Sequence, residues 1–142
     1  MLRTVITFGT FDVFHVGHLR VIERAALLGD RLVVGVSADA LNLRKKARVP
    51  VFSEAERLAI VGSLKQVDEV FLEESLELKR DYILRYGASV LVMGDDWAGR
   101  FDEFRDICEV VYLPRTPAIS TTALIEKIAG AEAGGPEAAL SA

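Results

Sequence analysis

The chain has 142 residues, the length of one ordinary globular domain. Hydrophobic residues make up 51% of it, which argues against disorder over most of the chain. The net charge of −4 argues against general binding to nucleic acid, which requires a basic face, but it leaves room for a small anion in a local basic pocket.

Membrane and secretion signals are not apparent in the sequence. No apolar run approaches the ~20 residues that cross a bilayer, and the first ten residues indicate a strand and not a secretion signal. The single cysteine excludes an intrachain disulfide. We therefore expect a cytoplasmic protein.

The first third of the chain has the pattern of a strand, a helix and a second strand. Residues 4–8 are a short apolar run that ends at Gly9, which predicts a strand. Residues 19–29 carry apolar side chains at helical spacing and end at Gly29, a residue that favours a helix end. Residues 31–37 are a nearly continuous β-branched run, typical of a strand buried on both faces. This order predicts a βαβ unit with parallel strands.

The rest of the chain continues the alternation. Residues 38–52 are polar and basic and predict a functional loop, while Ser53 and Glu56 form the capping box of a helix that reaches residue 64. Further strands are expected at 68–73, 89–94 and 109–113, and further helices at 75–87 and 121–130, with a loop and a short helix at 95–106. We expect one α/β domain over residues 1–130, with a Rossmann-like, doubly wound, five-stranded parallel sheet, and a disordered tail at 131–142.

Polar and Gly-rich segments follow four of these strands, at residues 9–18, 44–48, 94–97 and 115–122. Ligands of doubly wound sheets bind at the carboxyl ends of the strands. The sequence therefore predicts that these four segments form one site.

Both histidines of the chain lie in the first segment. His15 and His18 are three residues apart, so they share a face around the first turn of a helix, and Gly17 between them leaves room for a ligand. A helix amino end after the turn at Gly9 suits a phosphate. Two other roles stay open: metal ligands, although the usual third ligand is missing, or structural histidines. The segment contains neither a Walker A loop nor a dinucleotide G-x-G-x-x-G.

The other segments offer basic and polar side chains. Arg44, Lys45, Lys46 and Arg48 could contact an anion or simply form a solvated loop. In the last segment Arg115 is a bidentate donor, and Ser120 or Thr121 could cap the final helix and bind a ligand as well.

Asp95, Asp96 and Trp97 follow the fourth strand directly. A carboxylate beside a glycine turn could bind a base or a ribose. Trp97 could instead pack in the core.

Two of these stretches resemble the signatures of one family. The stretch "GTFDVFHVGH" resembles the H-x-G-H signature of the cytidylyltransferases within the nucleotidyltransferase superfamily, and "RTPAISTT" resembles their second signature. The stretches "LGDRLVVGVSAD", "VMGDDWAGRFD" and "CEVVYLPRT" are similar to glycerol-3-phosphate cytidylyltransferases. The resemblance covers residues 4–130.

The resemblance implies a reaction in which CTP and a phosphorylated alcohol give a CDP-alcohol and pyrophosphate, by in-line attack of the acceptor phosphate on the α-phosphorus without a covalent enzyme intermediate. It also implies Mg²⁺ bound through the triphosphate and not by protein side chains, a homodimer, and no nucleic-acid partner. The favoured acceptor is glycerol 3-phosphate, and the CDP-glycerol product would suit teichoic acid biosynthesis and other glycerophosphate polymers or lipids.

The resemblance also implies roles for individual residues. Catalysis is expected from His15, His18, Lys46 and Arg115. CTP is expected to contact Gly9, Thr10, Phe11, His15, Gly17, His18, Arg48, Asp95, Arg115, Thr116, Ile119, Ser120, Thr121 and Thr122. The acceptor is expected to contact Asp12, Lys45, Lys46, Lys65 and Lys79, with Lys45 an alternative to Lys46.

Three positions depart from the family pattern. Pro117-Ala118 replaces a Glu-Gly pair in the second signature, Lys65 replaces an arginine, and Leu76 replaces a tryptophan near the acceptor. Ethanolamine phosphate, choline phosphate, or ATP with flavin mononucleotide therefore stay open as alternative substrates. A nucleotide-binding regulator without catalysis is the alternative from another class, and the intact histidines and Ser/Thr cluster argue against it.

Overall fold

The computed structural model describes residues 2–46, 48–114 and 120–133, and the side chains of residues 45–46 and 131–133 lie outside that description. Five strands form one sheet in the order β3-β2-β1-β4-β5. They are β1 (Thr4–Gly9), β2 (Arg31–Ser37), β3 (Glu69–Glu73), β4 (Val90–Gly94) and β5 (Glu109–Leu113). Every pairing is parallel, which confirms the predicted doubly wound sheet.

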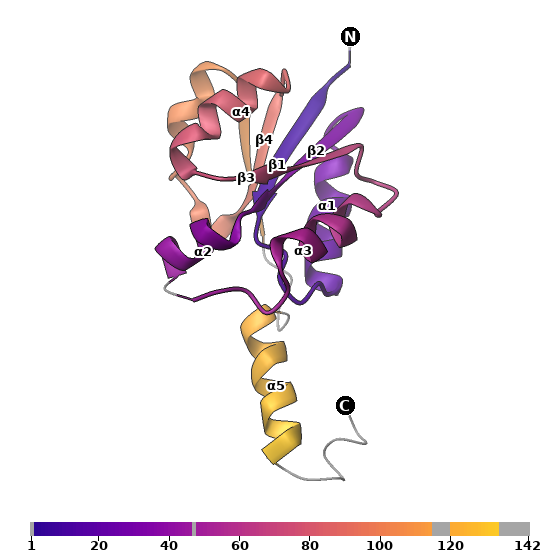
Figure 1. Cartoon of the computed structure of the whole chain (residues 1–142). Helices are drawn as coiled ribbons and strands as arrows, with labels where there is room; N and C mark the ends of the chain where they lie inside the picture. Colours follow the sequence, from indigo (N-terminus) through magenta and orange to yellow (C-terminus); the bar gives the residue numbers. More distant parts are fainter. Residues whose placement is uncertain (1, 47, 115–119, 134–142) are drawn as a thin grey trace.

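The helices follow in chain order. They are α1 (Val16–Ala26), α2 (Asp39–Lys46), α3 (Glu54–Gly62), α4 (Lys79–Arg85) and α5 (Thr121–Ala133). Short 3₁₀ turns lie at Leu76–Leu78, Asp95–Trp97 and Asp102–Asp106. Figure 1 shows α1 and α3 on one side of the sheet, α4 on the other, and α5 extending away from the layers. Among the described residues, no helix is long and apolar enough to cross a membrane.

Two hydrophobic clusters hold the layers together, one on each face of the sheet. Val5 and Val34 point toward α1 and α3, where Ile22 and Val61 pack against them. Their neighbours along the strands point the other way, toward a cluster that contains Tyr82 and Ile83 of α4. The cause is the two-residue period of a strand, which sends successive side chains to opposite faces. The sequences of strands with both faces covered are therefore continuous apolar runs.

The strand order reverses between β1 and β4. From β1 the chain moves outward to β2 and β3, and it then crosses to β4 and β5 on the other side. Such a switch point opens a crevice beyond the carboxyl ends of the strands. Gly9 ends β1 and Gly94 ends β4, so two glycines border that crevice.

The segment predicted as a loop at residues 38–52 contains the helix α2, so that prediction is wrong for residues 39–46. Reciprocal bonds with α3 support this helix: the Asp39 N–H donates to Glu54 Oε1 at 3.0 Å, and the Glu54 N–H donates to Asp39 Oδ2 at 3.3 Å. These contacts span fifteen positions, so a local pattern of charges could not reveal them.

Helix ends also differ from the prediction. Helix α1 begins three residues earlier than expected, because His15 caps it, and it ends at Ala26, before Gly29. Gly29 is needed for another reason: a Cβ there would lie 2.4 Å from the carbonyl oxygen of Arg3. Helix α5 continues to Ala133, beyond the expected end at residue 130. The rest of the predicted tail, residues 134–142, lies outside the described part of the chain.

Candidate active site

A cavity of about 370 Å³ lies at the carboxyl ends of the strands. Its lining includes the last residue of each strand: Gly9, Ser37, Glu73, Gly94 and Leu113. The start of α1 and the start of α5 complete the wall. The predicted convergence of segments 9–18 and 94–97 with Ser120, Thr121 and Thr122 is therefore confirmed.

The two histidines cap the amino end of α1. His15 is the N-cap residue, and its Nδ1 accepts a hydrogen bond from the N–H of Gly17 at 3.0 Å. Nδ1 of His18 accepts from the N–H of His15 at 3.2 Å. Because each Nδ1 is an acceptor, a neutral ring at either position carries its proton on Nε2. Backbone geometry therefore sets the tautomer of both rings.

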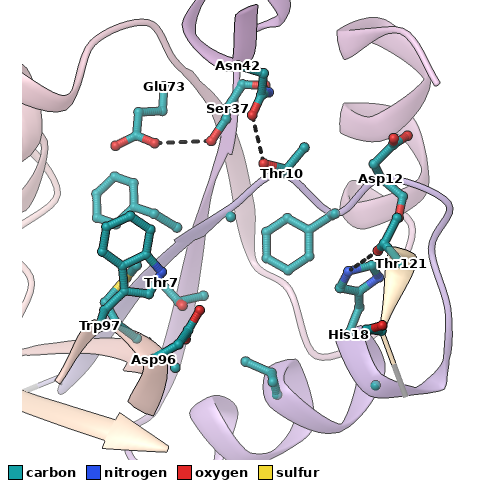
Figure 2. Close-up of a pocket in the computed structure, with 18 of the residues that line it drawn as sticks. Thr7, Thr10, Asp12, His18, Ser37, Asn42, Glu73, Asp96, Trp97 and Thr121 are labelled. Carbon is teal, nitrogen blue, oxygen red and sulfur yellow. Dashed lines mark hydrogen bonds between the residues drawn. The ribbon is translucent and has the colours of Figure 1, made fainter. Parts of the chain in front are cut away.

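Both Nε2 atoms face the start of α5. Each lies 3.4 Å from Oγ1 of Thr121, whose hydroxyl also lies 3.0 Å from the carbonyl oxygen of Asp12 and donates to it. Figure 2 shows His18 and Thr121 directed toward one another. Ser120 caps α5, since its Oγ accepts from the N–H of Ala123 at 3.0 Å. Two imidazole N–H groups and the positive end of a 13-residue helix thus share one wall, which suits an anion.

The electrostatics of the histidine pair disfavour two charged rings at once. The ring centroids are 3.9 Å apart, so two imidazolium rings would repel strongly. Burial lowers the pKa of His15 below its usual value. His15 is therefore neutral at pH 7 and acts as a hydrogen-bond donor through Nε2, not as a cation.

The loop before α1 has an unusual backbone that Asp12 stabilises. Phe11 has φ of 55° and Val13 has φ of 46°, values that are rare outside glycine and costly for a β-branched residue. The Asp12 carboxylate accepts from the N–H groups of Val13, Val51 and Phe52 at 3.1, 2.7 and 2.8 Å. These three bonds fix the loop, and Asp12 also lines the cavity, so its contact with an acceptor stays a prediction.

Gly9 lines the cavity, as its predicted contact with CTP requires, and it has a structural role as well. A Cβ at this position would lie 2.9 Å from the ring of Phe11. The missing side chain therefore makes room for that ring, which is buried against α1 and lines the cavity. Gly9 shapes the nucleotide end of the cavity indirectly, through Phe11.

Arg57 is a buried residue that sequence reasoning missed. Its side chain is fully buried and donates to the carbonyl oxygens of Thr10, Ser37 and Phe52 at 2.9, 2.6 and 3.0 Å, and to Asp39 Oδ1 at 2.7 Å. It joins the ends of β1 and β2 to the starts of α2 and α3. The signal in the sequence was a charged residue four positions before Val61, on the apolar face of a predicted helix.

Asn42 is the second residue that sequence reasoning missed. It is buried in α2 and lines the cavity. Its Oδ1 accepts from Thr10 Oγ1 at 2.9 Å, and its Nδ2 donates to the carbonyl oxygens of Ser37 and Ala38. Figure 2 shows the bond between Thr10 and Asn42. Nothing in the sequence pointed to Asn42, because its segment was predicted as a loop.

The far end of the cavity holds a buried ion pair. Nζ of Lys79 lies 2.7 Å from Oε2 of Glu73, and the two side chains are 3% and 1% exposed. The same Nζ lies 3.7 Å from the centroid of the Phe8 ring. Burial lowers the pKa of Lys79, and the Glu73 carboxylate partly offsets that effect. Lys79 thus lies at the cavity, where its predicted role requires it.

Asp95 and Lys65 are predicted site residues that do not line the cavity. Asp96 and Trp97 line it, whereas Asp95 is exposed beside them, so the carboxylate at this point is Asp96. Lys65 is exposed in the connection between α3 and β3. This connection leads into the amino end of β3, while the cavity lies at the carboxyl ends.

Some predicted site residues fall outside the description. Arg115, Thr116 and Ile119 are outside the described residues, as are the side chains of Lys45 and Lys46. Arg48 is exposed and lines the cavity. Within the described ranges, no group of three or more His, Cys, Asp or Glu side chains could hold a metal ion.

Comparison with known proteins identifies the family of this chain. The cytidylyltransferase-like family model matches residues 6–127. A glycerol-3-phosphate cytidylyltransferase of Bacillus subtilis (strain 168) is 49% identical over 129 residues, which cover 91% of this chain and 99% of the relative. An enzyme of the same description from Bacillus spizizenii is 44% identical, covering 90% of this chain and 98% of the relative.

A solved structure agrees with the fold. The lipopolysaccharide core biosynthesis protein of Thermoplasma volcanium superposes with a TM-score of 0.69 at 24% identity, over 82% of this chain and 99% of that one. The family match spans both the histidine cap of α1 and the start of α5, the two elements that meet at the cavity. The chain belongs to the cytidylyltransferase-like family of nucleotidyltransferases.

Proposed function

We propose that the protein transfers CMP from CTP to glycerol 3-phosphate and releases pyrophosphate. The observation that carries this proposal is the 49% identity to a glycerol-3-phosphate cytidylyltransferase over 99% of that relative's length. The cavity supports it with donors for phosphate at one end and a buried ammonium at the other.

The reaction requires one bond to form and one to break. An oxygen of the acceptor phosphate attacks the α-phosphorus of CTP, and the bond from that phosphorus to the bridging oxygen breaks, so pyrophosphate leaves. In such a reaction the protein contributes positioning and stabilisation of developing charge.

His15 and His18 are the residues that we assign to the transition state. Their Nε2–H groups are held in place by the cap of α1, and they bond to Thr121 in the absence of substrate. Phosphate oxygens of CTP can replace Thr121 Oγ1 as the acceptor. No part of the cap has to move, so the donors are preorganised.

The remaining CTP contacts come from elements around the same wall. Among the residues that the structure describes, Arg48 is a cation that lines the cavity. Ser120, Thr121 and Thr122 line it at the amino end of α5. Asp12, Glu73 and Asp96 are the described anions of the lining, so Arg48 and Lys79 cannot by themselves balance a triphosphate. We therefore retain Lys46 and Arg115 as catalytic cations and Thr116 and Ile119 as CTP contacts.

Mg²⁺ fits this site as a companion of CTP. The ion is expected on the phosphates of CTP and not on protein side chains, so the site needs no carboxylate to hold it. Bound there, Mg²⁺ would neutralise part of the phosphate charge. The protein's own residues supply the positioning.

The decisive experiment measures pyrophosphate release with Mg²⁺ and a matrix of substrates. CTP or ATP is combined with glycerol 3-phosphate, ethanolamine phosphate, choline phosphate or flavin mononucleotide. We expect turnover with CTP and glycerol 3-phosphate, and mass spectrometry should identify CDP-glycerol. Turnover with ATP alone, or no turnover in any combination, contradicts the proposal.

We also propose that the enzyme works as a homodimer in the cytoplasm. The resemblance to the family supports this assembly. Sedimentation velocity at enzyme concentrations used in the assay should give a mass of about twice 15.6 kDa. A species of the monomer mass throughout would contradict it.

A further inference from the structure

Glu73 is a buried carboxylate at the acceptor end of the cavity. It is the last residue of β3 and lies opposite Ser37, the last residue of β2, in the register of the sheet. Its Oε1 accepts from Ser37 Oγ at 3.3 Å, and its Oε2 faces Nζ of Lys79 at 2.7 Å. Two paired strand ends therefore fix the position of this carboxylate.

Burial disfavours the ammonium group of Lys79, whereas Glu73 and the ring face of Phe8 stabilise it. Lys79 is 3% exposed, and its Nζ lies 3.7 Å from the Phe8 ring centroid and 5.2 Å from that of Phe101. Burial lowers the pKa of Lys79, and Glu73 is the group that acts in the opposite direction by charge and by hydrogen bond. Without Glu73, the pKa of Lys79 would be lower still.

The hydrogen bonds of Lys79 leave capacity for a ligand. An ammonium has three N–H donors. Among the residues that the structure describes, Glu73 is the one acceptor bonded to Nζ of Lys79. The donor capacity of Lys79 that Glu73 does not use lies at the lining of the cavity, where an anion can approach.

A gain in folding stability alone does not explain why this ion pair is buried here. A buried ion pair is often no more stabilising than apolar side chains of the same size. The pair lies at the cavity lining, where Nζ of Lys79 sits over the ring of Phe8, a member of the cluster that contains Tyr82 and Ile83. The position of the pair at the cavity lining indicates a role in the reaction.

We propose that Glu73 is a positioning residue for the reaction: it holds the ammonium of Lys79 in the cavity so that its remaining donor capacity can bind the acceptor phosphate. This inference rests on the proposed function. Other titratable side chains of the described lining are Asp12, His15, His18 and Asp96, with Arg48 as a fixed charge. Of the charged and titratable side chains in the described lining, Glu73 is the one in contact with Lys79.

The first test compares three variants by steady-state kinetics. Glu73→Gln keeps the shape and removes the charge, so we expect KM for glycerol 3-phosphate to rise about 10-fold or more while KM for CTP stays within about twofold. Glu73→Asp keeps the charge and should show a smaller rise. Glu74→Gln makes the same charge change at the next residue, which is exposed and outside the cavity lining, and should match the wild type.

The pH dependence separates positioning from a purely structural role. A lysine with a lower pKa loses its charge at a lower pH. In Glu73→Gln the alkaline decline of kcat/KM for the acceptor should therefore move to lower pH, and in Glu73→Asp it should stay near the wild-type value. An unchanged alkaline limb in Glu73→Gln, or an equal rise of KM for both substrates, overturns the proposal.

A second measurement needs no turnover. The carbon-13 resonance of Lys79 Cε, assigned by its loss in Lys79→Arg, is followed against pH in labelled protein without substrate. We expect it to titrate at lower pH in Glu73→Gln than in the wild type, and equal titration overturns the inference. If the wild type made no CDP-glycerol, the proposed function would fail while this titration would still test the pair. Thermal unfolding and CTP binding by calorimetry confirm that each variant is folded.

Discussion

His15 uses its two ring nitrogens for two separate tasks. Nδ1 accepts from the N–H of Gly17 and caps α1, while Nε2 faces Thr121 across the cavity. The first task is structural and the second is chemical. A substitution that keeps one and removes the other can therefore separate them.

We predict that His15→Asn keeps the helix cap and loses catalysis. Asparagine is among the best N-cap residues, since its side-chain oxygen accepts from the same backbone N–H groups, but it offers no donor at the position of Nε2. We expect kcat to fall about 10²- to 10³-fold, as for loss of one transition-state donor. The melting temperature at pH 7.5 should remain within a few degrees of the wild type.

The pH dependence of stability provides the control for this variant. Because burial lowers the pKa of His15, the unfolded chain binds its proton at a higher pH than the folded protein does. The wild type therefore loses stability as the pH falls below about 6.5, the usual histidine pKa, toward the lower pKa of the folded state. His15→Asn should lose less over the same range in denaturant titrations. A variant with wild-type activity would contradict the assignment of Nε2.

At the scale of elements, the sheet positions the acceptor end through a glycine. A Cβ on Gly35 of β2 would lie 2.6 Å from a ring atom of Phe8 and 2.7 Å from one of Phe71. These two rings pack edge to face at 5.8 Å, and Nζ of Lys79 lies over the Phe8 ring. The absence of a side chain at Gly35 thus supports the position of Lys79 through Phe8.

We predict that Gly35→Ala costs about 1–3 kcal/mol of the free energy of unfolding, the usual cost of overpacking a core. Because Phe8 must shift, KM for the acceptor should rise more than KM for CTP. Gly130→Ala is the matched control: apart from the chain neighbours and the backbone of α5, no atom of the described residues lies within 4 Å of the added Cβ, and α5 should tolerate or favour alanine. Denaturant unfolding of both variants checks the prediction, and equal stability of both would contradict it.

At the scale of the whole molecule, the cavity joins segments from both ends of the chain. Thr121 of α5 bonds to Asp12 in the loop after β1, across 109 positions of sequence. A ligand that contacts both segments binds the folded protein and has no comparable site in the unfolded chain. Such a ligand must raise the melting temperature.

We predict that CTP with Mg²⁺ raises the melting temperature by about 5–10 °C at 100 times its dissociation constant. This follows from about 2.7 kcal/mol of linked stabilisation in a protein of this size. ATP at the same concentration should give a much smaller shift, because we propose CTP as the substrate. Differential scanning fluorimetry measures both, and an equal shift with ATP would contradict the assignment of the nucleotide.

The sequence by itself determined the class of fold and the shared face of the two histidines. Continuous β-branched runs, the capping box at Ser53 and the glycines after strands are local signals, and the structure confirms the sheet that they predict. The spacing of His15 and His18 is local too, since one helical turn places both rings on the same face. Local periodicity therefore sufficed for these features.

Only the tertiary structure decided what surrounds them. Arg57, Asn42 and Glu73 act on partners that lie far away in the sequence or in another element, and no period of 2 or 3.6 residues encodes such contacts. The same limit explains why Asp96 and not Asp95 lines the cavity, and why Lys65 lies away from it. Buried polar groups find their partners when the chain packs, so their roles follow from the packing.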